Sequence, residues 1–257
     1  MQAIWGWLGS LIFGLILDQA AHAAEIKVLT AGVMKEIILL LKPKFEKQSG
    51  HNLTVNVAPA GTLAKRIEAG EVFDLAVITR PAIEILIEKG KIAAGSRTDL
   101  AGVGIGVVVK TGAPLPDIST GDSFKRSVLA AKSLTHTDPA AGATSGIYLA
   151  KLFERLGIAD QVKSKVILVP GGSSALLVAR GEVELAIQQI SEIFTVPGTT
   201  YVGPLPAEIQ NITVYSAGVS TNTQQADAAR AFIRILTGPE VAGMLKPHGL
   251  NPVIVER

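Results

Sequence analysis

The fold prediction starts from residues 136–146, which read His136-Thr137-Asp138-Pro139-Ala140-Ala141-Gly142-Ala143-Thr144-Ser145-Gly146. Residues 133–137 predict a short strand, because the Asp-Pro pair that follows does not continue it. Beyond the loop, apolar residues recur at helical spacing and predict a helix that begins at Thr144: Leu149, Leu152, Phe153 and Leu156. The order of strand, small-residue loop and helix indicates an α/β fold.

The predicted helix start is also a candidate anion site. Its first backbone N–H groups have no partner within the helix, and the helix dipole makes this end positive. The hydroxyl groups of Thr144 and Ser145 add two further donors. An anion or a carboxylate fits such a place. The alternative is an ordinary capped helix, because serine and threonine are favoured at helix starts in any case.

The composition is that of a packed globular protein. Of the 257 residues, 48% are hydrophobic and 18% are charged, which excludes a disordered chain and leaves room for one large domain or two smaller ones. Basic and acidic residues number 24 and 22, so we expect no nucleic-acid partner. The four histidines are scattered and the sequence has no cysteine, so we expect no metal site.

The first 23 residues differ from the rest of the chain. An apolar run from Ile4 to Leu17 precedes Ala21-His22-Ala23, the small-x-small pattern that signal peptidase reads. We interpret residues 1–23 as an export signal, cleaved near Ala23. The alternative is a retained anchor, but the run is shorter than the roughly 20 residues that span a bilayer. An exported chain without disulfides fits the bacterial periplasm.

The order of strand, loop and helix recurs along the chain. Strands are predicted at residues 25–29, 53–57 and 74–79, and each runs into small residues or Arg80-Pro81 before a helix. This alternation predicts a parallel sheet wrapped by helices. Pro43 falls inside the first of these helices, where we expect a kink or a break.

A second unit of the same kind follows the Pro/Gly-rich residues 111–117. Two apolar strands, Val103–Val109 and Ile212–Val219, are long enough to cross between the two units. We therefore predict two lobes, each a mostly parallel sheet flanked by helices, joined by two hinge crossings. The first lobe is expected to comprise residues 24–103 plus 218–257, and the second residues 104–217.

Open parallel sheets bind ligands beyond the carboxyl ends of their strands. In this sequence those positions carry hydroxyl, amide and glycine residues and one arginine. The candidate ligand-binding residues are Thr30, Gly32, Gly61, Thr62, Arg80, Thr144, Ser145, Ser173, Gln188 and Gln189. Such a set binds an oxygen-rich anion without a metal or another cofactor, and Arg80 would pair with a carboxylate. The alternative for Arg80 is a surface salt bridge.

Several stretches, taken together and in order, resemble one family. They are Phe45-Glu46-Lys47-Gln48-Ser49-Gly50, Ile67-Glu68-Ala69-Gly70-Glu71, Thr137-Asp138-Pro139 through Ser145-Gly146-Ile147, Leu156-Gly157-Ile158, Val178-Ala179-Arg180-Gly181-Glu182 and Gln188-Gln189-Ile190-Ser191-Glu192. After residue 23, about the whole chain is similar to the type II periplasmic substrate-binding proteins of ABC importers, in the branch of the molybdate-binding proteins. The resemblance implies the type II fold, whose two lobes close on a ligand like a hinged trap.

The resemblance is closer to one sub-branch than to the molybdate binders themselves. Molybdate binders carry hydroxylic residues, usually serine, in the first two loops and a tyrosine near the end of the second-lobe sheet. This chain has Ala31-Gly32-Val33 and Pro59-Ala60-Gly61-Thr62 in those loops, and Gln188-Gln189 near the tyrosine position. The stretches around residues 138–146 and 188–191 look closer to a sub-branch that includes periplasmic aconitate isomerase. Arg80 suits a polycarboxylate better than a tetrahedral oxyanion.

Two functions remain open at this point. The first, which we favour, is a transport receptor that carries a small organic acid or a molybdate-like oxyanion to an ABC permease, working as a monomer. The second is a cofactor-independent aconitate isomerase, which needs an acid and a base to move a proton. The candidates for that role are His136, Lys35 and Glu192, although each has an ordinary structural alternative. No dinucleotide loop and no serine-hydrolase arrangement is recognisable.

Overall fold

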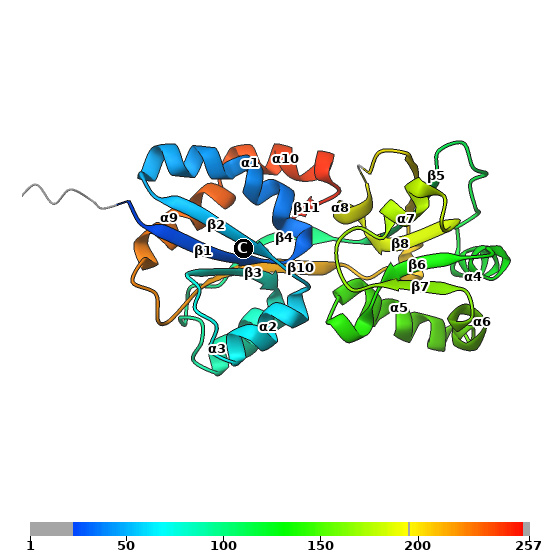
Figure 1. Cartoon of the computed structure of the whole chain (residues 1–257), viewed down its shortest axis with the longest axis horizontal. Coiled ribbons are helices and arrows are strands. Elements are labelled where there is room, and N and C mark those ends of the chain that lie inside the picture. Colours follow the sequence, from blue (N-terminus) through cyan, green and yellow to red (C-terminus); the bar gives the residue numbers. More distant parts are fainter. Residues whose placement is uncertain (1–22, 195, 254–257) are drawn as a thin grey trace, which may run out of the picture.

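The computed structural model describes residues 23–194 and 196–253, so the expected export signal lies outside the described residues except for its last position. The predicted α/β architecture is confirmed: two sheets lie side by side along the long axis of the molecule, and each is flanked by helices (Figure 1). Within these residues, no helix combines the length and the apolar character that crossing a membrane requires.

The first sheet has six strands in the order β11-β4-β10-β3-β1-β2. Their bounds are Glu25–Thr30 for β1, Asn52–Val57 for β2, Leu75–Thr79 for β3, Thr98–Val103 for β4, Thr213–Val219 for β10 and Asn251–Pro252 for β11. β1 pairs in parallel with β2 and β3, whereas β10 pairs antiparallel with β3 and β4. The sheet is therefore parallel where the sequence repeats its strand-loop-helix unit and antiparallel where the chain returns from the second lobe.

Helices cover both faces of the first sheet. They are α1 (Gly32–Ser49), α2 (Ala60–Glu68), α3 (Arg80–Glu88), α9 (Ala226–Leu236) and α10 (Pro239–Leu245), followed by the 3₁₀ turn η3 (Lys246–His248). Figure 1 shows α1, α9 and α10 on one face and α2 and α3 on the other. Phe45 of α1 meets Phe232 of α9 edge-on, with ring centroids 5.1 Å apart. The C-terminal helices thus complete the core of the first lobe.

Helix α1 continues through Pro43, so the break considered from the sequence does not occur. Proline leaves the carbonyl of Leu39 without its helical partner. Pro43 is exposed, so water can bind that carbonyl. Leu41 and Phe45 on the buried face hold the helix against the sheet on either side of the proline.

The second sheet has five strands in the order β7-β6-β8-β5-β9. They span Ile105–Lys110 (β5), Leu134–Thr137 (β6), Val166–Val169 (β7), Leu185–Gln189 (β8) and Thr199–Pro204 (β9). The helices around this sheet are α4 (Gly121–Ala130), α5 (Thr144–Arg155), α6 (Ala159–Lys163), α7 (Ala175–Arg180) and α8 (Ile190–Ile193), with short 3₁₀ turns η1 (Pro139–Ala141) and η2 (Ala207–Ile209). β6 pairs in parallel with β7 and β8, and β5 joins antiparallel.

The second crossing lies earlier in the chain than the sequence expectation placed it. The run from Val103 to Val109 divides at Gly104 into β4 of the first sheet and β5 of the second. β10 lies wholly in the first sheet, with Tyr215 opposite Thr79, so residues 213–217 belong to the first sheet and the second crossing lies between β9 and β10. Strand pairing sets this boundary, because apolar character alone does not say which sheet a strand joins.

One side chain ties the two crossings together. Gln210 accepts a hydrogen bond from the backbone N–H of Ile105 at 2.8 Å and donates from Nε2 to the Ile105 carbonyl at 2.9 Å. A Cβ on Gly104 would lie 3.1 Å from Gln210 Nε2, so the glycine allows this close approach. The hinge is therefore a pair of short segments held side by side by one amide.

Candidate functional site

A cleft of about 730 Å³ lies between the two lobes. The first lobe contributes the start of α1, the end of β2 and Tyr215 of β10. The second lobe contributes the loop before α5, residues 171–173 and the start of α8. The residues that line the cleft include Gly32, Val33, Lys35, Val57, Pro59, Thr137, Thr144, Ser145, Ser173, Gln189, Ser191, Glu192, Tyr215 and His248. Its volume suits a small molecule rather than a polymer.

The start of α1 forms the wall on the side of the first lobe. Its N-cap, Ala31, offers no side-chain hydrogen bond, and the first turn contains no acidic residue. The free N–H groups and the dipole of this 18-residue helix therefore make this end of the cleft attractive to negative charge. Gly32 leaves room here, since a Cβ on it would lie only 2.3 Å from Glu192 Oε1.

Glu192 reaches from α8 of the second lobe to the start of α1. Its Oε2 accepts a hydrogen bond from Gln188 Nε2 at 2.9 Å. The amide of Gln188 is fixed in turn, because its Oε1 accepts from the backbone N–H and the hydroxyl of Ser174. Protein surrounds the Glu192 carboxyl except where it opens into the cleft, and this burial raises its pKa from 4.5 to about 7.

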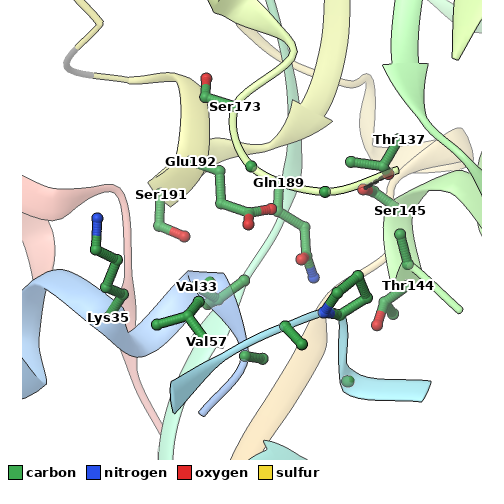
Figure 2. Close-up of a pocket in the computed structure, with 18 of the residues that line it drawn as sticks. Val33, Lys35, Val57, Thr137, Thr144, Ser145, Ser173, Gln189, Ser191 and Glu192 are labelled. Carbon is green, nitrogen blue, oxygen red and sulfur yellow. Dashed lines mark hydrogen bonds between the residues drawn. The ribbon is translucent and has the colours of Figure 1, made fainter. Parts of the chain in front are cut away.

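Gln189 lies next to Glu192 and is 3% exposed. Its Oε1 accepts a hydrogen bond from the Tyr215 hydroxyl at 3.0 Å. In the described part of the chain, three buried side-chain groups have no hydrogen-bond partner, and all three belong to residues that line the cleft: Ser173 Oγ, Gln189 Nε2 and Ser191 Oγ. Figure 2 shows the amide of Gln189 ending between Val33 and Thr144, with the carboxyl group of Glu192 between Ser191 and Gln189.

The start of α5 forms the wall on the side of the second lobe. Its N-cap, Ala143, also makes no side-chain hydrogen bond. Ser145 Oγ and Thr137 Oγ1 are hydrogen-bonded to each other at 3.0 Å, which fixes this corner of the cleft (Figure 2). A Cβ on Gly146 would lie 2.1 Å from the Thr137 carbonyl, so only glycine lets the helix start this close to β6.

Positive charge in the cleft lining comes from Lys35, whose Nζ lies 3.5 Å from Glu36 Oε1. His248 also lines the cleft, and its Nδ1 lies 2.7 Å from the Met244 carbonyl. Within residues 23–194 and 196–253, no three His, Cys, Asp or Glu residues gather as a metal site. The cleft therefore offers helix N-termini, neutral donors, the Lys35–Glu36 pair and the Glu192 carboxyl group of raised pKa.

Comparison with known proteins identifies the family. Residues 26–251 match the family model for bacterial extracellular solute-binding proteins. The chain belongs to this family. It is 33% identical over 253 residues to an aconitate isomerase from a Pseudomonas species, which covers 96% of this chain and 95% of that one. It is 26% identical to a molybdate-binding protein of Escherichia coli, with 94% and 95% covered.

Solved structures agree with this assignment at the level of the fold. The periplasmic molybdate-binding protein of Azotobacter vinelandii superposes with a TM-score of 0.75 at 20% identity, over 90% of this chain and all of that one. The two-lobed arrangement expected from the sequence is thus the arrangement of a known class of binding proteins.

This solute-binding protein brings half of the candidate ligand residues to the cleft. Gly32, Thr144, Ser145, Ser173 and Gln189 line it. Gln188 lies one layer behind, where it holds Glu192. Thr30 is fully buried and its hydroxyl donates to the Ala31 carbonyl at 3.1 Å.

Arg80 does not line the cleft of this binding protein. It forms an ion pair with Asp99 of β4, in which its Nε donates to Asp99 Oδ1 at 3.2 Å. The salt-bridge alternative raised from the sequence therefore describes its position. The Arg80 side chain reaches across β10 to Asp99, a carboxylate of its own lobe.

Gly61 and Thr62 meet the opposite lobe rather than the cleft. The backbone N–H of Gly61 donates to the Gly142 carbonyl at 3.1 Å, and the Thr62 hydroxyl donates to the Ala141 carbonyl at 2.6 Å. We call this contact between residues 61–62 and 141–142 the clasp. A Cβ on Gly61 would lie 2.9 Å from the Gly142 oxygen, so the two backbones touch without side chains between them.

Of the three candidates for proton transfer, the structure places two in the cleft and one outside it. Lys35 and Glu192 line the cleft, whereas His136 does not. His136 is 4% exposed, its ring lies 5.8 Å from that of Phe153, and burial lowers its pKa. It therefore packs the core of the second lobe as a neutral group.

Several cleft residues were not among the candidates from the sequence, and Ser191 and Tyr215 are two of them. Ser191 follows Gln188-Gln189 directly, so the run of polar residues after β8 was the available signal. Tyr215 comes from the middle of β10, a first-lobe strand that the sequence analysis assigned largely to the second lobe. Its contribution depends on which sheet that strand joins, and no local pattern marks this.

Proposed function

We propose that this solute-binding protein is a cofactor-independent isomerase that moves a double bond in an unsaturated tricarboxylate, with aconitate as substrate. The Pseudomonas relative named aconitate isomerase supports the substrate class. The observation that carries the proposal is Glu192, a carboxyl group of pKa about 7 that opens into the cleft. A general base works best when its pKa lies near the pH at which it operates.

Glu192 is harder to explain in a simple receptor for an anion. A carboxylate that faces a bound anion repels it, and this repulsion weakens binding. A base that takes a proton from the ligand needs this closeness, and the nearby start of α1 offers N–H groups and a positive dipole beside it. The same geometry that costs a receptor affinity therefore serves proton transfer.

The reaction needs no oxidant, reductant or cofactor. The Glu192 carboxylate takes a proton from the methylene carbon beside a substrate carboxylate, and the electrons of that C–H bond form a new double bond toward the central carbon. The former double bond opens, and its far carbon receives the proton back from the Glu192 carboxyl. Between the two transfers, the extra negative charge is delocalised onto the substrate carboxylates, where the N-termini of α1 and α5 stabilise it.

The cleft offers separate places for the carboxylates of such a substrate. The α1 and α5 starts stand on opposite walls, and both lack a side-chain cap. Gln189 Nε2 and Ser191 Oγ add donors between them. Lys35, which lies 3.5 Å from the cleft carboxylate of Glu36, adds a positive charge at the side. Three carboxylates can thus be bound by neutral donors and one cation, in accord with a tricarboxylate rather than a compact tetrahedral anion.

The second candidate function is a receptor that delivers a small anion to an ABC permease. The family match and the likeness to molybdate-binding proteins favour it. In this function Glu192 holds its proton and donates a hydrogen bond to the ligand. Under either function we propose that the chain is exported to the periplasm and works as a monomer.

An isomerisation assay tests the proposal. The purified protein is incubated with trans-aconitate in D₂O, and the cis isomer and deuterium incorporation are followed by NMR. Wild-type protein is expected to form the cis isomer, and Glu192→Gln to lose activity by about a hundredfold or more, as expected for a lost general base. Glu182→Gln is the matched control, because Glu182 is an exposed carboxylate paired with Arg180.

Two outcomes contradict the isomerase. Binding of trans-aconitate without turnover would leave the receptor as the function. Turnover that Glu192→Gln leaves unchanged would remove Glu192 from the reaction.

A further inference from the structure

The hydrogen bond from Tyr215 to Gln189 joins the two lobes inside the cleft. Tyr215 lies in β10 between β3 and β4 of the first sheet, and Gln189 ends β8 of the second sheet. The phenol oxygen and Gln189 Oε1 are 3.0 Å apart, and the two residues are 1% and 3% exposed. A buried polar contact of this kind holds both side chains in one orientation.

In this contact the phenol donates and Gln189 Oε1 accepts, so the other end of the amide faces the ligand. A phenol has one proton to give, and giving it to Oε1 turns the NH₂ group of the amide to the other side. There Nε2 is buried and has no hydrogen-bond partner among the described residues, although Gln189 lines the cleft. A buried donor without a partner is costly, so it is a place that a ligand oxygen fills.

We propose that Tyr215 is a positioning residue that fixes the amide of Gln189 so that Nε2 donates to a carboxylate oxygen of the ligand. The inference rests on the proposed function only for the class of ligand, a small polycarboxylate. A donor held in this way selects an oxygen without a proton and rejects an amide or ammonium nitrogen at the same place. Tyr215 thus sets specificity through Gln189.

The phenol is suited to this role over the whole working range of pH. Burial, and after it the negative charge of Glu192, raise the pKa of Tyr215 well above its usual range. The hydroxyl therefore keeps its proton and remains a donor to Oε1. A residue at this position that lost its proton near neutral pH could no longer donate to Oε1. The Gln189 amide would then flip and present Oε1, rather than Nε2, to the ligand.

A double-mutant cycle tests the proposal. The probe is tricarballylate, a saturated tricarboxylate with no double bond to move, so its binding is measured whether or not the protein is an isomerase. Dissociation constants are determined by calorimetry for wild type, Tyr215→Phe, Gln189→Met and the double variant. Tyr215→Phe keeps the ring in the core and removes only the hydroxyl.

We expect Tyr215→Phe to weaken binding about tenfold when Gln189 is present and less than twofold when it is Met. Thermal unfolding of each variant separates loss of fold from loss of binding. The matched control is Tyr201→Phe, which removes the same atom from a half-buried tyrosine packed edge-on against Phe194. Tyr201 does not line the cleft, and binding is expected to stay within twofold.

Equal weakening by Tyr215→Phe in both backgrounds would overturn the proposal, because Tyr215 would then act independently of Gln189. No weakening in either background would overturn it as well. Failure of the wild-type protein to bind tricarballylate would overturn the ligand class shared with the proposed function. Normal binding and coupling without turnover of aconitate would overturn only the isomerase.

Discussion

The cleft and the clasp are two places where the same local pattern meets the opposite lobe with opposite results. Both begin with a strand, a few small residues and a helix start in the first lobe: β1 to α1 at the cleft, and β2 to α2 at the clasp. At the clasp, the donors of Gly61 and Thr62 are bound by two carbonyl oxygens of the second lobe. At the cleft, the second lobe presents Glu192 and the free amide nitrogen of Gln189.

The residue of the second lobe that faces a helix start determines whether a ligand site forms there. A carbonyl oxygen completes the first-lobe donors at the clasp and leaves nothing for a ligand. At the cleft, the second lobe instead presents the Glu192 carboxyl group of raised pKa and the Gln189 Nε2 donor without a partner, and both remain available to a ligand. Glycine serves both places, because Gly32 and Gly61 each let atoms of the second lobe approach where a Cβ would collide.

The largest effect is expected from Gly32→Ala on the cleft side. The new methyl group would lie 2.3 Å from Glu192 Oε1, so the carboxyl must move. It can do so cheaply, as the end of a flexible side chain, and stability should hardly change. A misplacement of about 1 Å costs turnover about a hundredfold, measured as the rate of aconitate isomerisation.

Gly243→Ala is the control for that variant, because a Cβ on Gly243 meets nothing within 4 Å. It adds the same methyl group to α10, away from the cleft lining. If Gly32→Ala kept wild-type turnover, the closeness of Glu192 to the start of α1 would have no role in the reaction.

The second effect is the pH dependence of stability that Glu192 in the cleft contributes. Burial raises the pKa of Glu192 from 4.5 to about 7, so the folded protein keeps a proton that the unfolded chain releases. The stability contributed by this group is complete below about pH 4.5 and is lost as the pH rises to about 7. The full shift corresponds to about 3 kcal/mol, and water in the cleft reduces the loss to roughly 2 kcal/mol.

Urea unfolding of wild type and Glu192→Gln between pH 4.5 and 8 measures this loss. The difference between the two proteins isolates Glu192 from other titrating groups, including the buried neutral His136. We expect the free energy of unfolding of wild type to fall relative to that of Glu192→Gln as the pH rises. Parallel pH profiles would mean that the carboxyl group is not perturbed by folding.

The third effect concerns the clasp. Gly61→Ala puts a methyl group 2.9 Å from the Gly142 oxygen, a backbone atom that cannot move alone. The lobes are therefore expected to part on this side, with a larger radius of gyration in X-ray scattering and about tenfold weaker binding of tricarballylate. Thr62→Val, which removes the hydrogen bond to Ala141, should act in the same direction more weakly.

Thr54→Val is the control for the clasp, because Thr54 is exposed on β2 and makes its hydrogen bond to Glu25 within the first lobe. An unchanged radius of gyration in Gly61→Ala would show that the clasp does not hold the lobes together. Turnover at saturating substrate should change less in Gly61→Ala than in Gly32→Ala. Gly61 affects how the lobes close, whereas Gly32 affects the position of Glu192 inside the cleft.

The fold was predictable because each strand-loop-helix unit carries its own signals. Apolar spacing, glycine ends and Arg80-Pro81 at a helix start are local, and they place α1, α3 and α5 close to their observed bounds. The crossings were less predictable, because β10 is apolar enough to fit either sheet and only its pairing with β3 and β4 decides. Strand β9 has no signal of comparable strength and was not assigned.

The site was predictable as a set of loops but not residue by residue. The sequence identified the small hydroxylic residues at helix starts, and half of the candidates line the cleft. It could not tell which helix starts would meet a carbonyl oxygen, because that oxygen belongs to a distant part of the chain, as Gly142 does for Gly61. The roles of Glu192 and Tyr215 depend on their neighbours in the opposite lobe, which are the start of α1 and Gln189.

The smallest effect on stability and binding is expected from substituting Arg80, a charged residue at a strand end that forms an ion pair within its own lobe. Its guanidinium is paired with Asp99, which also accepts a hydrogen bond from Ser216 at 2.6 Å. Arg80→Ala is expected to lower the free energy of unfolding by about 1 kcal/mol or less, because the arginine side chain is 36% exposed. Binding of tricarballylate should stay within twofold, since Arg80 does not line the cleft. Arg97→Ala, which removes an exposed pair with Glu84, is the control. A large loss of affinity in Arg80→Ala alone would mean that the arginine leaves Asp99 for the ligand, and the first lobe would then contribute a charge to the cleft as well as a helix start.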